Sequence, residues 1–183
     1  MTVCYCDSLV SVDNSIKVTI IQHPLEEKHP FNTGRMAHLC LKRSEIIVTE
    51  VIDETLLAEC LGNHSVLLYP DLEWLPKFKG KKATNGAITN KPIEQIEQLV
   101  VIDATWRKSK KILYLNQALQ NLPRLSLQAG NPSAYSIRKS SFEDSLSTVE
   151  SITAALEILE AGKNFSELLK PFQRMIELQK QKQ

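Results

Sequence analysis

The run Leu-Val-Val-Ile at residues 99–102 constrains the fold of this chain more than any other feature. Continuous apolar character is typical of a strand that is buried on both faces, as in a parallel sheet covered by helices. Other short runs rich in branched residues, bounded by turn residues, precede and follow it. Together these patterns predict strands at residues 16–21, 45–51, 65–69, 99–102 and 124–127.

Helical patterns lie between the predicted strands. A helix is expected over residues 33–41, with Thr33 as its cap, and a short helix over residues 54–61. A basic helix follows Trp106, and two helices separated near residues 162–164 end the chain. Strands that alternate with helices predict an α/β fold with a mainly parallel sheet and helices on both faces.

Length and composition indicate one compact domain. The 183 residues fit the usual size of a single domain, and 43% hydrophobic with 23% charged residues allow a sizeable core. No apolar run approaches the roughly 20 residues that cross a bilayer, and the N-terminus lacks the pattern of a secretory signal. We therefore expect a single domain over residues 1–183, no membrane partner, a cytoplasmic location and reduced cysteines.

The sequence lacks the motifs of several common chemistries. Its six glycines are scattered singly, so no P-loop and no dinucleotide-binding fingerprint is present. Nucleophile-elbow and His-Glu-x-x-His motifs are also missing. Cys4 and Cys6 form only a Cys-x-Cys pair, and Cys40 and Cys60 are expected to be ordinary buried residues. We expect no metal site, and zinc in particular is not expected.

Parallel sheets bind their ligands beyond the carboxyl ends of strands, which points to the loops that begin at Gln22, Pro70 and Asp103 and to a fourth candidate at Gln128. Three segments of the chain carry side chains suited to binding or catalysis. The first runs from His23-Pro24-Leu25-Glu26 to Asn32-Thr33-Gly34-Arg35, where a helix start and Arg35 are suited to an anion. A plain capped helix explains that spacing equally well. The second, Asp103-Ala104-Thr105-Trp106, brings a carboxylate, a hydroxyl and an indole to the end of the strongest strand. Its alternative is an Asp103 helix cap beside a core tryptophan.

The third segment combines Tyr135-Ser136-Ile137-Arg138 with Leu146-Ser147-Thr148-Val149-Glu150. A Ser-Thr-x-Glu sequence before an apolar-periodic helix is close to a capping box, and that structural role is the default for Ser147 and Glu150. The stretch 70–92 is predicted to be a long surface loop, and loops of that length are usually functional or mobile.

Two clusters of basic residues are suited to phosphates, although a solvated lysine-rich face explains either cluster alone. The clusters are Lys77, Lys79, Lys81 and Lys82, and Arg107, Lys108, Lys110 and Lys111.

The ordered set of these motifs resembles the DTW-domain family of tRNA-uridine aminocarboxypropyltransferases over residues 4–159. The likeness rests on Cys4-Tyr5-Cys6, the two parts of the first loop, Tyr69-Pro70, the tetrad from Asp103 to Trp106, and the two parts of the third segment. The resemblance implies a SPOUT-like fold with a C-terminal trefoil knot. It also implies transfer of the 3-amino-3-carboxypropyl group of S-adenosylmethionine to N3 of a uridine in tRNA, with release of methylthioadenosine.

For individual residues, the resemblance and the chemistry together give a set of expected roles. Asp103 would be the base that takes the N3 proton or the group that orients the uracil. Thr105 would position a polar edge of either substrate, and Trp106 would offer a stacking face or a wall for a flipped uridine. The basic clusters would contact tRNA phosphates. The residues expected to bind the co-substrate S-adenosylmethionine are Asn32, Thr33, Gly34, Arg35, Pro70, Leu125, Leu127, Tyr135, Arg138, Ser147, Thr148 and Glu150.

One departure from the family pattern leaves alternatives open. Family members commonly carry a further Cys-x-x-Cys upstream of the Cys-x-Cys pair, so the zinc site is expected to be lost or the sequence to be a shortened form. The alternatives to the transferase are a knotted RNA methyltransferase and a non-catalytic RNA-binding module. Both a monomer and a homodimer are compatible with the sequence.

Overall fold

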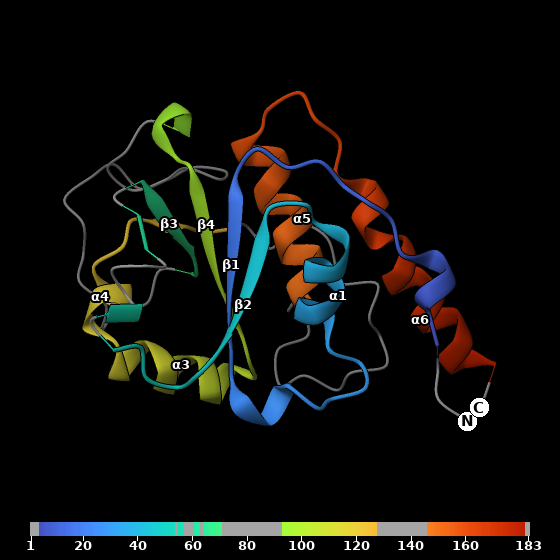
Figure 1. Ribbon diagram of the computed structural model, residues 1–183, viewed down its shortest axis with the longest axis horizontal. Coiled ribbons are helices and arrows are strands. Elements are labelled where there is room, and N and C mark those ends of the chain that lie inside the picture. Colours follow the sequence, from blue (N-terminus) through green and yellow to red (C-terminus); the bar gives the residue numbers. More distant parts are fainter. Residues whose placement is uncertain are drawn as a thin grey trace.

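The structure is a computed structural model that describes residues 4–53, 55–56, 61–62, 64–70, 93–127 and 146–181. Within these ranges, five parallel strands form one sheet in the order β2-β1-β4-β3-β5 (Figure 1). The predicted α/β class with a parallel sheet is therefore confirmed. The strands are β1 (Lys17–Gln22), β2 (Ser44–Val48), β3 (Ser65–Leu68), β4 (Gln98–Asp103) and β5 (Arg124–Leu125).

Helices cover both faces of this sheet, as predicted (Figure 1). One face carries α1 (Thr33–Cys40), α5 (Thr148–Leu159) and α6 (Lys170–Lys180), and the other carries α3 (Trp106–Leu115) and α4 (Gln117–Gln120). Short 3-10 helices are η1 (Cys6–Ser8), η2 (Pro24–Glu26), η3 (Ile93–Gln95) and η4 (Ser166–Leu169).

The side-chain alternation of the central strands divides the core into two layers. Leu99 and Val101 of β4 pack in the larger layer with α1, α5 and α6. Val100, between them, packs in the smaller layer against Ile112 and Leu113 of α3. Because successive residues of a strand point to opposite faces, both sides of β4 are buried, which explains its continuous apolar sequence.

The boundaries of several predicted elements need correction. The N-cap of α1 is Asn32 and not Thr33, because Asn32 has the extended backbone of a cap and its Oδ1 accepts the Arg35 N–H at 2.5 Å. The strand predicted to end at residue 51 ends at Val48, and the strand predicted over residues 124–127 is only two residues long.

Some predictions fall on residues that the structure does not describe. Of the short helix predicted over residues 54–61, only Thr55 and Leu56 are described as helical. Residues 71–92 of the predicted long loop, and residues 128–145, which belong to the C-terminal part of the chain where a knot is expected, lie outside the described ranges. No helix in the described part of the chain is long and apolar enough to span a membrane.

Helix α5 is held at both of its ends. Its C-cap residue, Glu160, accepts the N–H of Ser15 at 2.7 Å and of Ile16 at 2.9 Å, just before β1 begins. Lys163 donates to the other oxygen of this carboxylate at 2.6 Å. Burial alone would raise the pKa of Glu160, but these donated hydrogen bonds outweigh it and lower the pKa. The N-terminal end of α5 is held at the candidate site.

Candidate functional site at the strand ends of β1 and β4

The carboxyl ends of β1 and β4 lie side by side at a point where the chain direction diverges. Gln22, the last residue of β1, is paired in register with Asp103, the last residue of β4. From β1 the chain continues to α1 on one face of the sheet, and from β4 it continues to α3 on the other. Such topological switch points are where open parallel sheets bind their ligands.

The Asp103 carboxylate is the centre of this region. It is 6% exposed and accepts hydrogen bonds from three neutral side chains. Gln22 Nε2 donates to Oδ2 at 2.9 Å, Asn32 Nδ2 donates to Oδ2 at 2.8 Å, and Thr148 Oγ1 donates to Oδ1 at 2.6 Å. The structure therefore joins the predicted second segment directly to the first and to the third, which are separated from it by 71 and 45 residues.

Gln22 is a partner of Asp103 that sequence reasoning missed. The signal was present, because Gln22 is the polar residue that ends the other central strand. Only the strand order shows that β1 and β4 are neighbours. Once that order is known, the pairing of the two strand ends follows.

Gly34 lies against the same carboxylate. A Cβ at this position would be 2.6 Å from Asp103 Oδ2 and 2.7 Å from its Cγ, distances that Cβ atoms essentially never adopt. The start of α1 thus approaches Asp103 as closely as it does because residue 34 has no side chain.

Asn32 is already fully engaged within the protein. Its Oδ1 caps α1, and its Nδ2 donates to the Glu26 carbonyl at 3.1 Å as well as to Asp103. The first N–H groups of the helix, those of Thr33 and Gly34, have no intrahelical acceptor, and Arg35 is exposed beside them. The donors that remain for an anion at this helix start are therefore backbone N–H groups and the Arg35 guanidinium.

The start of α5 confirms the predicted capping box. Ser147 Oγ accepts the Glu150 N–H at 3.4 Å, and Glu150 Oε2 accepts the Ser147 N–H at 2.8 Å. Ser147 and Glu150 thus have a structural role, and they present the next residue, Thr148, to Asp103.

The start of α3 contains the other two residues of the tetrad. The N-cap of this helix is Thr105, whose side chain makes no capping bond and is exposed. The alternative in which Asp103 caps the basic helix is therefore wrong, since Asp103 lies two residues earlier and is bonded elsewhere. The half-buried Trp106 meets Tyr69 edge to face, with ring centroids 5.9 Å apart.

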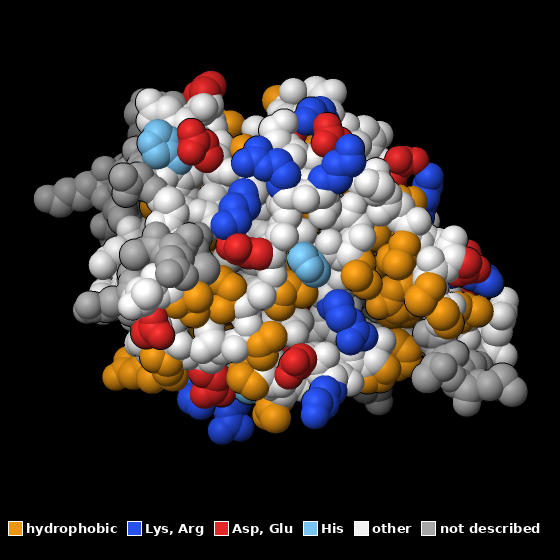
Figure 2. All heavy atoms as spheres, in the orientation of Figure 1, with side chains coloured by type: hydrophobic (Ala, Val, Ile, Leu, Met, Phe, Trp, Pro, Cys, Tyr) orange, Lys and Arg blue, Asp and Glu red, His pale blue; other side chains and the backbone are white. Residues whose placement is uncertain are grey.

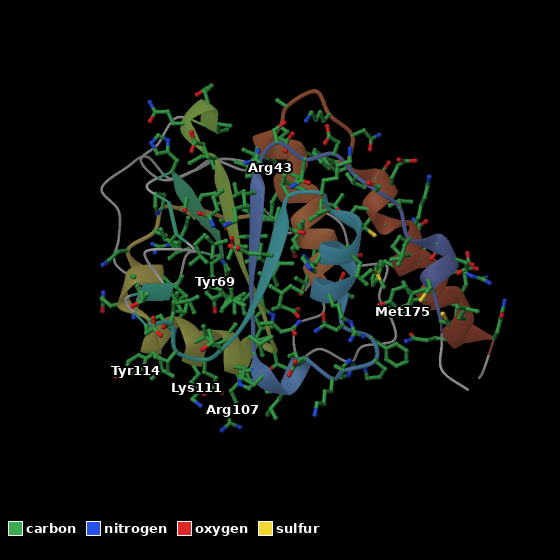
Figure 3. All side chains as sticks on the ribbon, in the orientation of Figure 1. Arg43, Tyr69, Arg107, Lys111, Tyr114 and Met175 are labelled. Atoms are coloured by element: carbon green, nitrogen blue, oxygen red, sulfur yellow. The ribbon has the colours of Figure 1, made fainter. Side chains whose placement is uncertain are left out.

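Tyr69 connects the end of β3 to α3. Its ring is buried between the sheet and that helix, and its hydroxyl shares a 3.0 Å hydrogen bond with Ser109 Oγ (Figure 3). Burial raises the pKa of Tyr69, and the hydrogen bond to Ser109 opposes part of that increase. Trp106 is thereby held in an aromatic contact that fixes one edge of the site.

The loops after β1 and β2 are fastened to α3 by ion pairs. His23 Nδ1 accepts the Leu25 N–H, so Nε2 donates to Glu50 at 2.5 Å. Lys111 donates to the other Glu50 oxygen at 2.6 Å, and Lys108 donates to Glu26 at 2.9 Å. The hydrogen bond from Lys111 lowers the pKa of Glu50, with a further contribution from His23. Of the four α3 cations that were predicted to contact phosphates, Lys108 and Lys111 are thus paired with carboxylates.

The remaining predicted residues divide into two groups. Leu125 is fully buried in the core, while Leu127 and Pro70 are half-buried at strand ends. The others lie outside the described residues: Tyr135, Arg138, Lys77, Lys79, Lys81 and Lys82.

The cysteines are distributed largely as predicted. Cys40 is buried, whereas Cys4 and Cys6 are exposed free thiols near the start of the chain, and Cys60 lies outside the described ranges. Among the described residues there is no group of three or more His, Cys, Asp or Glu side chains that could hold a metal ion.

Comparison with known proteins gives a consistent result. The DTW domain model matches residues 1–180. Proteins named tRNA-uridine aminocarboxypropyltransferase 2 from Macaca fascicularis and Mus musculus are each 30% identical over 190 residues, covering 98% of this chain and 60% of theirs. The protein of that name from Drosophila melanogaster is 28% identical over 169 residues, covering 88% of this chain and 64% of its own. The chain thus spans less than two thirds of these relatives, and no solved structure matches it.

Proposed function

The chain belongs to the DTW domain family, and from this premise we propose that it transfers a 3-amino-3-carboxypropyl group to N3 of a uridine in tRNA. The names of the relatives support the group transferred and the RNA acceptor. The observation that carries the proposal is the Asp103 centre, because one buried carboxylate joins three family-like motifs at a ligand-binding strand end.

We further propose S-adenosylmethionine as the donor. When bound, it supplies a carbon made electrophilic by the adjacent sulfonium. The donor set at the start of α1 fits the carboxylate of its amino-acid portion: the Thr33 and Gly34 N–H groups and the exposed Arg35 are all suited to an anion. The family resemblance assigns the adenosine to backbone groups around residues 125–130 and 147–148, of which 128–130 lie outside the described ranges.

In this proposal Asp103 is a positioning residue. Three protein donors occupy most of the roughly four acceptor directions of its carboxylate. This favours a structural hydrogen-bond acceptor over a base that exchanges protons with the substrate. By holding Asn32 it places the α1 N-terminus, and by holding Thr148 it places the α5 N-terminus. The exposed Thr105 and the half-buried Trp106 then face the uracil, which stacks on the indole ring.

The reaction is tested with unmodified tRNA and S-adenosylmethionine labelled separately in the methyl and carboxypropyl groups. We expect the carboxypropyl label alone to enter the RNA: the new N3–carbon bond replaces the N3–H bond, the carbon–sulfur bond breaks, and methylthioadenosine and a proton are released, the proton to water. Transfer of the methyl label alone would identify an RNA methyltransferase. Binding of RNA and cofactor without any transfer would identify a non-catalytic module.

The role of Asp103 is tested by the pH dependence of kcat in Asp103→Asn. A positioning role predicts a lowered kcat and a raised KM for S-adenosylmethionine at every pH, with an unchanged shape of the profile. Loss of the acid limb of the profile would instead show that Asp103 is the base. Asp13→Asn, which changes an exposed carboxylate, is the matched control and should behave as the unmodified protein.

A further inference from the structure

We propose that Arg107, Lys110 and Tyr114, on the outer face of α3, form a binding site for a single-stranded segment of the RNA next to the modified uridine, with Tyr114 stacking on an unpaired base. This inference rests on the proposed function for the identity of the RNA. The three residues are called the α3 stripe below.

The three side chains share one face of the helix. Lys110 follows Arg107 by three residues and Tyr114 follows Lys110 by four, which are the spacings of neighbours along a helix surface. The opposite face is occupied by the core residues Ile112 and Leu113. Arg107 and Tyr114 extend from α3 away from the sheet, with Lys111 between them (Figure 3).

Tyr114 has no structural reason to be aromatic. Its side chain is 75% exposed, the most exposed large hydrophobic residue in the described part of the chain, and it belongs to neither layer of the core. Hydrophobic and basic side chains lie next to each other along this edge of the molecule, over α3 (Figure 2). Proteins that bind single-stranded RNA combine exposed aromatic rings with cations, because every base offers a face for stacking and the cations contact the phosphates.

The charges on α3 separate into two pairs. Lys108 and Lys111 are neutralised by Glu26 and Glu50, as described above. Arg107 and Lys110 are exposed and form no ion pair with any described residue. The two cations left to meet phosphates are therefore those that lie in line with Tyr114.

The position of the stripe relates it to the candidate site. Helix α3 begins at Trp106, three residues after Asp103, and Tyr114 lies about 12 Å further along the helix axis at 1.5 Å per residue. A strand whose target base faces Trp106 would thus run along the stripe. An acidic peptide would also be attracted to the two cations, but it would gain little from a flat aromatic ring.

The first test measures binding of unmodified tRNA and of a single-stranded oligouridylate by fluorescence anisotropy. Tyr114→Ala should weaken binding by about 5- to 100-fold, the loss expected for one stacked base. Tyr114→Phe, which keeps the ring, should bind within about twofold of the unmodified protein. Because Tyr114 is mostly exposed, unchanged thermal unfolding of both variants would confirm that the fold is intact.

The second test measures the salt dependence of the same binding. Arg107→Gln and Lys110→Gln should each reduce the slope of log Kd against log salt by about one unit. Lys180→Gln, an exposed lysine at the end of α6, removes the same charge elsewhere and should leave the slope unchanged.

The outcomes distinguish this inference from the proposed function. If the protein transfers the carboxypropyl group, and Tyr114→Ala binds tRNA with the same affinity as the unmodified protein, the stripe is overturned and the proposed function stands. Ring-dependent RNA binding without transfer supports the stripe and refutes the function. Absence of RNA binding overturns both. A further outcome uses polyglutamate as a competitor of RNA binding. If polyglutamate competes equally well with the unmodified protein and with Tyr114→Ala, and if the ring has no effect on RNA affinity, the partner is an acidic protein and the stripe is overturned.

Discussion

The contact between Gly34 and Asp103 predicts that Gly34→Ala destabilises the protein although alanine is the better helix former. The new Cβ would lie 2.6 Å from Asp103 Oδ2, so the carboxylate must move by several tenths of an ångström. It is not free to move, because Oδ2 accepts hydrogen bonds of 2.9 Å and 2.8 Å from Gln22 and Asn32. The substitution therefore strains a buried network and not a flexible side chain.

The magnitude follows from opposing contributions. Overpacking of this kind costs about 1–3 kcal/mol, and weakening two hydrogen bonds to a carboxylate adds about 1–2 kcal/mol. The higher helix propensity of alanine returns at most about 1 kcal/mol. We expect a net loss of about 1–4 kcal/mol in the free energy of unfolding, measured by urea denaturation, and a fall in carboxypropyl transfer because the donors at the start of α1 are displaced.

Two controls make this prediction specific. Gly62→Ala adds the same methyl group where its nearest neighbour would be Gln98 Oε1 at 3.7 Å, an ordinary contact, and should change the free energy of unfolding by less than about 1 kcal/mol. In an Asp103→Ala background the closest atom to the new methyl group is the Cβ of residue 103 at 3.1 Å, so most of the cost of Gly34→Ala should disappear. Wild-type stability of Gly34→Ala with Asp103 in place would refute the reasoning.

Three further predictions concern the ends of α5 and the acid response. Ser147→Ala removes half of the capping box and should lower the free energy of unfolding by about 1 kcal/mol in urea denaturation; an unchanged midpoint would contradict the role of the cap. Glu160→Gln should cost about 1.5–3 kcal/mol in the same assay, because a charged acceptor of several hydrogen bonds is lost, and stability equal to wild type would rule this out. Since the folded-state pKa values of Glu50 and Glu160 are lowered, their contribution is present above the unfolded value near 4.5 and is lost as the pH falls through the folded pKa. Unfolding midpoints measured from pH 7 to 3 should therefore fall most steeply at the acid end, and less steeply in Glu160→Gln; parallel curves would contradict the assignment.

The sequence predicts the strands well because their patterns are local. The apolar run before Asp103 and the Ser-Thr-x-Glu motif are each explained by contacts within a few residues or by burial on both faces. The N-cap of α1 was misassigned because Asn32 and Thr33 are both good capping residues, and only the backbone geometry distinguishes them.

The arrangement of the site depends on long-range pairing that no local pattern contains. The sequence indicates that Asp103 ends a buried strand, but the order β2-β1-β4-β3-β5 places Gln22 beside it. In the same way, the sequence favours Lys108 and Lys111 as phosphate contacts, yet Glu26 after β1 pairs with Lys108 and Glu50 after β2 pairs with Lys111. Their availability is decided by which loop folds over α3.

Helix α5 cannot change its length without losing a contact, because Thr148 at its start and Glu160 at its end are both hydrogen-bonded to the sheet region. Its twelve residues span about 18 Å, close to the roughly 20 Å of the six-residue strand β4, so the helix reaches from the carboxyl end of β4 to the amino end of β1. Insertion of a single residue would turn one end by about 100° relative to the other and release either Thr148 or Glu160. During synthesis, moreover, Asp103 emerges before Thr148, so a ribosome-bound chain lacks a completed centre until α5 has been made and docked.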